Sequence, residues 1–347
     1  MGKTIKLGGI SLLALFLIAV CLIMPTVTAH GARSGLILCG NIVIPSLFPF
    51  CVLALFCENS NVIQVISRLI SKFTEKIFHL SGEQFSILIL SVLGGFPVGI
   101  RLIKAQHSAG KLSPEQAKRM GLYCISAGPA FIVTAIGEGI LGNRRMGILL
   151  LISNVLATLF LCFIIERPHK PTVSKLTIKR VSISDAFVEA TAGAAKTVFG
   201  ICGWVVLFAT ITELINSVAL PKKLLAPILY SLEVTTAAIT AERNILLICA
   251  ILSFCGFCVH CQIYSIGKEI APNYAKFLLF RVIHGAVSCT ITYTVLRLNP
   301  KIVSTLSNHI APIRNNVSFT YSSALALVIL SVCLIFSIND RKNNKIV

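Results

Sequence analysis

The sequence predicts an all-α, polytopic integral membrane protein with two related repeats, broken or re-entrant helices and about seven to nine membrane segments. Composition is the first reason: 55% of the residues are hydrophobic and 13% are charged, whereas soluble proteins carry about 25% charged residues. The second reason is a pair of similar stretches, 90–98 and 252–259, in which glycine, proline or small residues interrupt an apolar run. Because hydrocarbon leaves an unwound backbone unpaired, such breaks in matching halves point to the binding site of a transporter.

The candidate membrane segments are apolar stretches that approach the roughly 20 residues a helix needs to cross a bilayer. They are residues 7–28, 36–57, 84–100, 121–142, 146–165, 197–218, 244–265, 276–297 and 319–338. The first stretch has two open interpretations, a cleaved signal peptide or a retained helix, because Lys3 and Lys6 precede it and Val27-Thr28-Ala29 resembles a cleavage site. We favour the retained helix.

Amphipathic and polar pieces lie between these stretches. Apolar residues recur at helical spacing within 61–80, namely Val62, Val65, Ile66, Leu69 and Ile70. We expect this helix to lie on the membrane or to form half of a re-entrant hairpin, with 222–240 as its counterpart in the second half. A further, polar helix is expected to begin at Ser113-Pro114-Glu115-Gln116, because serine is a good cap, proline suits the first turn and glutamine can complete a capping box.

The charge pattern predicts topology. The net charge is +18, and much of it lies in two short links, 101–119 and 166–180. Basic links favour the cytoplasmic side of a membrane, so we expect the connection 166–183 and the tail at Arg341-Lys342 to be cytoplasmic. This reading also removes the need for a nucleic-acid partner.

The chain divides into five parts: an N-terminal membrane helix or signal anchor, a first repeat, a linking helix with a basic loop, a second repeat, and a C-terminal loop, helix and tail. Their bounds are 1–30, 31–145, 146–183, 184–298 and 299–347. Whether the repeats are parallel or inverted stays open, since a single re-entrant hairpin would change the answer.

The first break is the place where solute binding is expected. Gly94, Gly95, Pro97 and Gly99 make a regular helix costly, because a helix interior loses about 1 kcal/mol per glycine and about 3 per proline relative to alanine. Backbone groups freed there can bind a solute or an ion; the alternative is a kink that serves helix packing.

A second interruption follows at Ser126-Ala127-Gly128-Pro129. We expect a half-helix to start at Pro129, whose N-terminus would favour an anionic group. Again the alternative is a kink, with Ser126 bonded within its own helix.

Several ionisable or strongly polar residues fall inside apolar segments, where charges are rare and often functional. Glu233 and Thr235 lie on the second amphipathic piece, beside the expected site, and His260 and Gln262 directly follow the break at Gly256. Arg281 and His284 share one face of 276–297, either as site residues or as a pair that bridges helices.

No catalytic or metal-binding pattern is present in the sequence. There is no nucleophile elbow, zinc-protease helix or phosphate-binding loop. The cluster of Cys255, Cys258, His260 and Cys261 lacks the second ligand pair of a structural zinc site. We therefore expect no enzyme activity, no metal and no cofactor, and the coupling ion stays open.

At these motifs the chain resembles the sporulation integral membrane proteins of spore-forming bacteria that carry nucleoside-recognition (Gate) repeats. Gly95-Phe96-Pro97-Val98-Gly99 is similar to the family's Gly-Tyr-Pro-x-Gly. The other similar blocks follow in the family's order and are residues 44–50, 128–132, 232–235, 256–262 and 281–285. The match departs at Gly128, where the family usually has asparagine, and at Cys258, His260 and Cys261, where it has small residues.

The resemblance implies a relation to concentrative nucleoside transporters and a role in moving dipicolinate across the outer forespore membrane during sporulation. Half-helix N-termini and Arg281 would then hold the carboxylates of this aromatic dicarboxylate. The departures leave a paralogue with another solute open.

The sequence thus predicts a multi-pass cell-membrane carrier of a small organic solute, an anionic aromatic acid or a nucleoside, that works by alternating access. The expected binding residues are Gly95, Pro97, Gly99, Ser126, Gly128, Pro129, Glu233, Thr235, Gly256, His260, Gln262 and Arg281. The alternatives are a nucleoside or nucleobase carrier and a non-transporting sporulation assembly protein. The lipid bilayer is the expected partner, and a homo-oligomer is open.

Overall fold

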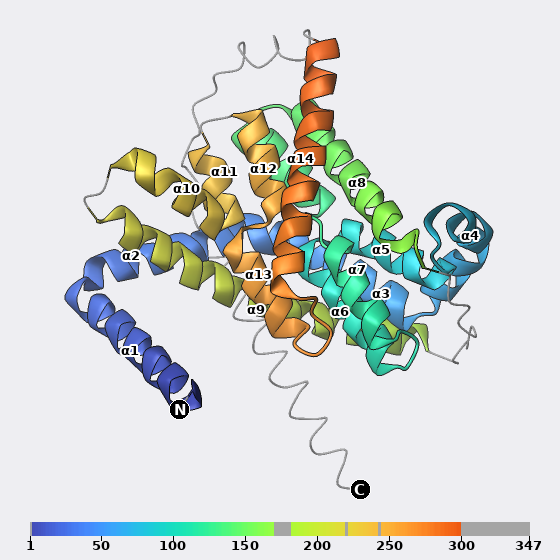
Figure 1. Ribbon diagram of the computed structural model, residues 1–347, viewed down its shortest axis with the longest axis horizontal. Coiled ribbons are helices and arrows are strands. Elements are labelled where there is room, and N and C mark those ends of the chain that lie inside the picture. The colour runs from blue at the N-terminus through green and yellow to red at the C-terminus, as the bar shows by residue number, and fades with distance from the viewer. Residues whose placement is uncertain (1, 170–181, 219–220, 242–243, 300–347) are drawn as a thin grey trace, which may run out of the picture. The chain divides into compact units, whose positions relative to one another are not determined.

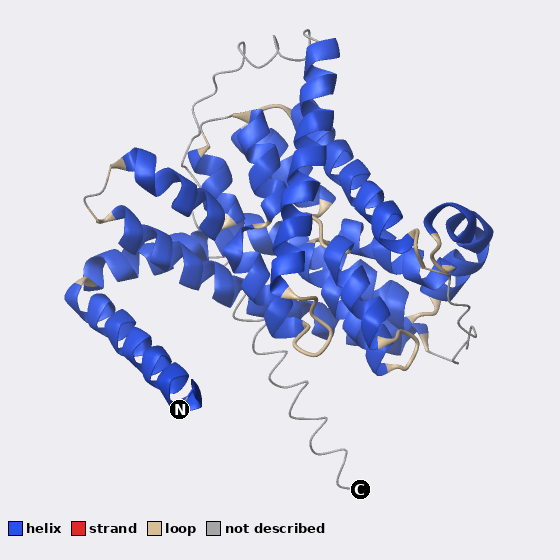
Figure 2. Ribbon diagram, viewed as in Figure 1, coloured by secondary structure: helices blue, strands red, loops and turns tan. Residues whose placement is uncertain are grey.

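A computed structural model describes residues 2–169, 182–218, 221–241 and 244–299 (Figure 1). In these ranges the secondary structure is helical throughout, with no strand (Figure 2). The predicted all-α fold class is therefore confirmed. The expected helix at 319–338 and the tail at Arg341-Lys342 lie outside the described residues.

The helices follow one another with short connections. In chain order they are α1 (Gly2–Ile23), α2 (Pro25–Leu38), a π-helical turn η1 (Cys39–Val43), α3 (Ile44–Asn59), α4 (Val62–Phe78), α5 (Gly82–Gly94), α6 (Phe96–Ser108), α7 (Pro114–Tyr123), the π-helical η2 (Phe131–Ile140), α8 (Arg144–Glu166), α9 (Ile183–Asn216), α10 (Lys222–Leu232), α11 (Val234–Thr240), α12 (Ile245–Phe254), α13 (Gly256–Ile266) and α14 (Tyr274–Leu298).

Five stretches are long and apolar enough to cross a membrane within the described part of the chain. They are Pro25–Asn59, Arg144–Glu166, Ile183–Asn216, Ile245–Ile266 and Tyr274–Leu298. A sixth crossing is added if α4 and α5, which meet at 94°, count as one bent span. Each of the five contains or overlaps an expected segment.

Three expected segments differ from the structure in a way that has a physical cause. The stretch 84–100 is divided between α5 and α6 by its glycines, and 121–142 is divided by a non-helical stretch at 125–128. At the start of the chain, a bend at Met24 ends α1, and Pro25 then begins α2. Proline suits a first helical turn because its missing N–H needs no partner there.

The membrane spans expose apolar side chains and bury polar ones, which is the reverse of the arrangement in a soluble protein. Along α8, one face exposes a row of large apolar side chains spaced four apart: Ile148, Ile152, Leu156, Phe160 and Ile164. The opposite face buries Ser153, Asn154 and Thr158. Such an arrangement suits a helix with lipid on one side and protein on the other. Together with the apolar spans, it makes the chain a multi-pass membrane protein.

The amphipathic helix α4 follows the same rule. It exposes Val65, Leu69, Phe73 and Ile77 at four-residue spacing. Its inner face carries polar side chains, including Gln64 and Ser67, that are buried against the rest of the fold. The expected amphipathic helix is confirmed, and its apolar face is the outer one.

The longest helix, α9, packs closely on α2 through a small-residue pair. Gly31 and Gly35 lie one helical turn apart on α2, and both are buried. A Cβ atom added to Gly35 would lie 2.7 Å from the Cα atom of Val206, and one on Gly31 would lie equally close to the Cα atom of Thr210. Small residues at this spacing let membrane helices approach until their backbones touch. This contact joins the first span to the first helix of the second half.

Gly35→Leu is therefore expected to force α2 and α9 apart and to lower the stability of the protein by about 1–3 kcal/mol, as overpacking does in cores. The measurement is the melting temperature of the detergent-solubilised protein. Gly203→Leu is the matched control, because a Cβ atom at Gly203 on α9 meets open space. Equal melting temperatures for the two variants would contradict the close-packing argument.

Candidate functional site

The first break is held open by glycine. α5 ends at Gly94, and Gly95 adopts φ +85° and ψ −179°, a conformation that is strained for residues with a Cβ atom. The chain then re-enters a helix at Phe96, with Pro97 in the first turn. The backbone of Gly95 therefore separates two short helices, α5 and α6, inside the fold.

The second interruption lies directly against the first. After α7, residues 125–128 are not helical and the helix resumes at Pro129, as the sequence predicts. A Cβ atom built on Gly128 would lie 3.4 Å from the Cα atom of Gly95. One turn further on, a Cβ atom on Gly99 would overlap the carbonyl oxygen of Cys124. Glycine at these positions lets the two unwound stretches cross in contact.

The second half contains the same pair of features. Glu233 is extended between α10 and α11, and its two carboxylate oxygens accept the N–H groups of Thr235 and Thr236 at 2.9 and 2.7 Å. Between α12 and α13, Cys255 and Gly256 are both left-handed, with φ +74° and +63°. A Cβ atom on Gly256 would lie 3.4 Å from the Cα atom of Glu233. In each half, two successive helices are interrupted and the interruptions touch.

These four breaks surround one small cavity of about 40 Å³. Its lining comes from both halves: Val43, Leu47, Phe96, Pro97, Gly128, Phe131, Ile201, Val205, Glu233, Val234, Thr235, Cys258, Val259 and Gln262. A water molecule needs about 10–15 Å³ on this measure, whereas pockets for drug-sized ligands reach about 300–1,000 Å³. The cavity thus has room for water, and it must widen to admit an organic solute.

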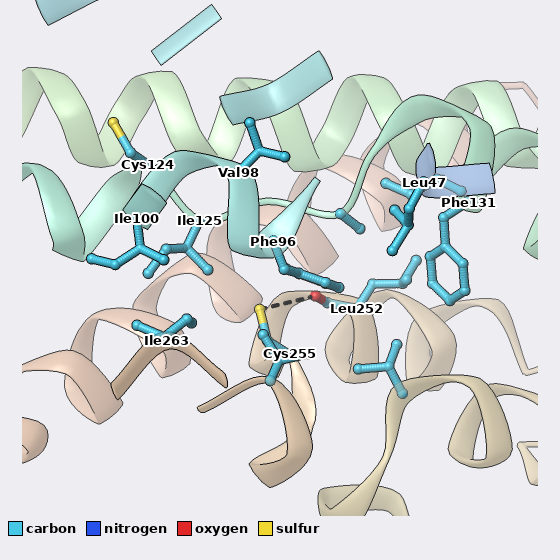
Figure 3. Close-up of a cluster of buried hydrophobic side chains, with 14 of the residues drawn as sticks. Leu47, Phe96, Val98, Ile100, Cys124, Ile125, Phe131, Leu252, Cys255 and Ile263 are labelled. Carbon is cyan, nitrogen blue, oxygen red and sulfur yellow. Dashed lines mark hydrogen bonds between the residues drawn. The ribbon is translucent and has the colours of Figure 1, made fainter. Parts of the chain in front are cut away.

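The walls of the cavity are mainly apolar. Figure 3 shows the buried hydrophobic cluster to which the lining residues Leu47, Phe96 and Phe131 belong, with Leu252 and Cys255 from the second half in the same cluster. The polar side chains in the lining are Glu233, Thr235 and Gln262, each at most 3% exposed. The cavity can therefore offer hydrogen bonds from one side and an apolar surface from the others.

The expected binding residues fall into three groups around this cavity. Five of them line it: Pro97, Gly128, Glu233, Thr235 and Gln262. Four others form or flank the breaks without lining it: Gly95, Gly99, Pro129 and Gly256. The remaining three, Ser126, His260 and Arg281, have partners elsewhere.

Arg281 is a buried tie between helices. Its side chain, 1% exposed on α14, donates from Nη1 to the carbonyl oxygen of Ile125 and from Nη2 to that of Leu122, both at 2.8 Å. These carbonyls lie at the C-terminal end of α7, where partial negative charge gathers. Nη1 also lies 3.7 Å from Cys255 Sγ. Arg281 therefore stabilises the unwound stretch after α7, which belongs to the first half. It also contacts the break between α12 and α13 in the second half.

His260, on α13, bonds to the last residue of α12 and to the first residue of α14. Its Nε2 lies 2.8 Å from the carbonyl oxygen of Phe254, and its Nδ1 lies 3.3 Å from the hydroxyl oxygen of Tyr274. Because a carbonyl can only accept, the hydrogen is assigned to Nε2, and Nδ1 accepts from the tyrosine. Phe257 and Phe277 pack around the ring. His260 therefore faces an aromatic box and not the cavity.

His284 joins α14 to α8, in agreement with the helix-bridging alternative, although its partners Asn154 and Thr158 were not singled out in the sequence. Ser126 Oγ lies 2.8 Å from Asn154 Oδ1, while His284 Nε2 lies 3.2 Å from the carbonyl oxygen of Asn154 and 3.1 Å from Thr158 Oγ1. The signal for Asn154 was an amide in an otherwise apolar run. No comparable signal marks the apolar lining residues Val43 of η1 and Ile201 and Val205 of α9.

Comparison with known proteins adds one relative. The chain is 23% identical to the sporulation integral membrane protein YlbJ of Bacillus subtilis (strain 168), with 78% of each chain covered. No protein-family model matches the chain. No solved structure gives a significant match. The relative is an integral membrane protein by name, which agrees with the apolar spans described above.

Removing Arg281 should loosen the unwound stretch. In Arg281→Gln, the carbonyls of Leu122 and Ile125 lose their charged donors, and each unsatisfied group costs about 1–3 kcal/mol. We expect a lower melting temperature in detergent and faster maleimide labelling of Cys124, which is fully buried in the native protein. Arg281→Lys should retain part of the stability. Native-like labelling and melting of Arg281→Gln would show that the tie is dispensable.

Proposed function

We propose that this protein is a secondary carrier that moves a small organic acid across a membrane, and that dipicolinate at the outer forespore membrane is its solute during sporulation. One observation carries the proposal: interrupted helices from both halves meet around a single buried cavity. Carriers built from repeats bind their solutes at such a meeting point of discontinuous helices. The name of the bacterial relative, a sporulation integral membrane protein, supports the setting.

The half-helices suit an anion. α6, η2 and α13 all start at their breaks, and residues in or beside their first turns line the cavity: Pro97 for α6, Gly128 for η2 and Cys258 for α13. Helix N-termini carry partial positive charge and unpaired N–H groups, which favour carboxylates. Apolar walls that include Phe96 and Phe131 would receive an aromatic ring. No catalytic step is proposed.

Transport would follow from relative movement of the two halves. The cavity is too small for the solute in the observed conformation, so binding requires one half to rock away from the other. The two breaks of the second half would keep their partners during this motion, because the partners of Glu233 and His260 come from the same half. Arg281 is different, since it bonds to carbonyls of the first half from α14.

A nucleoside or nucleobase carrier is the second candidate, and one observation favours it. The lining contains the carboxylate of Glu233 and the neutral groups of Thr235 and Gln262 but no cation. A carboxylate next to the site disfavours a dianion and suits the hydroxyl and amine donors of a neutral nucleoside. The charge of the solute is therefore the property that separates the two candidates.

Gln262→Ala should slow solute flux about tenfold, because it removes an amide from the cavity wall and a hydrogen bond to a solute contributes about 0.5–1.5 kcal/mol. The assay is uptake of radiolabelled dipicolinate, and in parallel uridine, by proteoliposomes. Cys261→Ala is the control, since Cys261 is the neighbouring residue and does not line the cavity. Absence of flux for both solutes, with a tight protein partner on affinity purification, would favour an assembly role instead.

Glu233→Gln separates the two solute classes. If the solute is an anion, removal of the carboxylate charge should lower the KM for dipicolinate several-fold, because like charges in a site of low dielectric repel strongly. If the solute is a nucleoside, the same change should raise the KM for uridine, because a charged acceptor binds donors more tightly than a neutral amide does. Glu233 also caps α11, but a partial loss of folded protein would lower the maximal rate and not the KM.

A further inference from the structure

A second, larger cavity lies beside the first and is strongly basic. Its volume is about 380 Å³. Three cationic side chains line it, Arg101 and Lys104 from α6 and Lys196 from α9, and its lining includes no acidic residue. The other lining residues are Thr197, Gly200, Ile201, Trp204, Gln262, Ser265 and Ile266. Cavities of this size accept small organic ligands.

Two of the three cations are held in place by backbone oxygens. Arg101 Nη1 donates to the carbonyl oxygen of Gly193 at 2.6 Å and to Thr197 Oγ1. Lys104 Nζ donates to the carbonyl oxygen of Ile266, the last residue of α13, at 2.9 Å. These bonds fix the positions of the cations without neutralising their charge.

None of the three cations forms a salt bridge within the described residues. Glu58 interacts electrostatically with Arg101, but it does not line the cavity and no salt bridge joins the two. A concave surface lined by one sign of charge concentrates ions of the opposite sign. The chemistry that fits is a carboxylate or phosphate group.

The basic cavity adjoins the candidate site. Ile201 on α9 and Gln262 on α13 line both cavities, so they form a shared wall. A solute held by Arg101, Lys104 and Lys196 would lie directly outside the four helix breaks. Movement of that wall would join a cavity of about 380 Å³ to one of about 40 Å³.

The basic cavity also belongs to the side of the protein that carries the basic links. Arg119, in the link 101–119, forms an ion pair with Glu166 at the end of α8, with 3.2 Å between Nε and Oε2. This contact brings the first link to the point where the second link begins. The end of the first link and the start of the second therefore lie side by side, and their positive charge favours the cytoplasmic face of the membrane.

We infer that this basic cavity is a docking site that binds the carboxylate groups of the solute from the cytoplasmic side before the solute enters the central cavity. The inference rests on the proposed carrier function. Its chemical requirement is one or two carboxylates on a small body. The phosphate of an anionic lipid headgroup has similar chemistry and is the competing occupant that the test must distinguish.

The protein carries its own reporter for this cavity. Trp204 is the single tryptophan of the sequence, and it lines the basic cavity. The experiment records Trp204 fluorescence of the full chain in nanodiscs of zwitterionic lipid during titration with dipicolinate. Pyridine, which has the same ring without carboxylates, is the ligand control. We expect a saturable change with dipicolinate and none with pyridine.

Two variant pairs test where the ligand binds. Gly200→Leu fills the cavity without a clash, because a Cβ atom at Gly200 meets open space, and Gly203→Leu adds the same bulk on α9 outside the cavity. Lys196→Gln removes an exposed cation from the lining, and Lys118→Gln removes an exposed cation elsewhere. Dipicolinate affinity should fall about tenfold for Lys196→Gln, as expected for one lost charged hydrogen bond. It should also fall for Gly200→Leu, because the leucine side chain occupies the space of the solute. It should be unchanged for the controls.

The inference is overturned if dipicolinate gives no saturable signal, or if Gly200→Leu and Lys196→Gln bind as tightly as their controls. It is also overturned if phosphatidylglycerol nanodiscs produce the fluorescence change without solute and abolish the response to dipicolinate, since the cavity would then be a lipid site. Solute uptake by proteoliposomes tests the proposed carrier function independently of this binding result. If the protein transports the solute but does not bind it in the basic cavity, only the docking-site inference is wrong. If it binds the solute there but does not transport it, the proposed carrier function is wrong.

Discussion

The constraint that governs this fold is the need to satisfy the backbone groups of helices that stop inside a membrane. Three of the four breaks have a side chain that bonds to their backbone. Arg281 donates to the carbonyls after α7, Glu233 accepts the first N–H groups of α11, and His260 bonds to the last carbonyl of α12. Without such partners, each free polar group would cost several kcal/mol in hydrocarbon. The breaks can therefore remain unwound and still be stable.

The same constraint explains which parts of the fold can be predicted from sequence. Gly95 and Gly128 interrupt apolar runs with residues that helices avoid, so composition alone places both breaks. The helix start at Ser113 can also be predicted from the sequence, and the structure contains the expected capping box with Gln116. The interruption at Glu233 was missed, because Leu232-Glu233-Val234 contains neither glycine nor proline and reads as a continuous amphipathic helix. Only the side-chain cap reveals it.

The predicted site illustrates a second limit. A polar residue in an apolar segment signals that its side chain is inside the protein, and His260, Gln262 and Arg281 are all buried as that rule requires. Burial does not say which neighbour the side chain faces. Gln262 faces the cavity, whereas His260, two residues earlier on the same helix, faces an aromatic cluster. The direction depends on how α13 packs, and this is set by contacts far away in the chain.

The inward polar face of α4 has a consequence for how the protein is made. Gln64 and Ser67 are sheltered by later parts of the chain: the Ser67 backbone lies against Gly82 of α5, and His79, at the end of α4, bonds to the carbonyl oxygen of His169 beyond α8. While the ribosome has released only the first hundred residues, that face has no complete cover. The cover of α4 is therefore complete only when α8 has also been inserted.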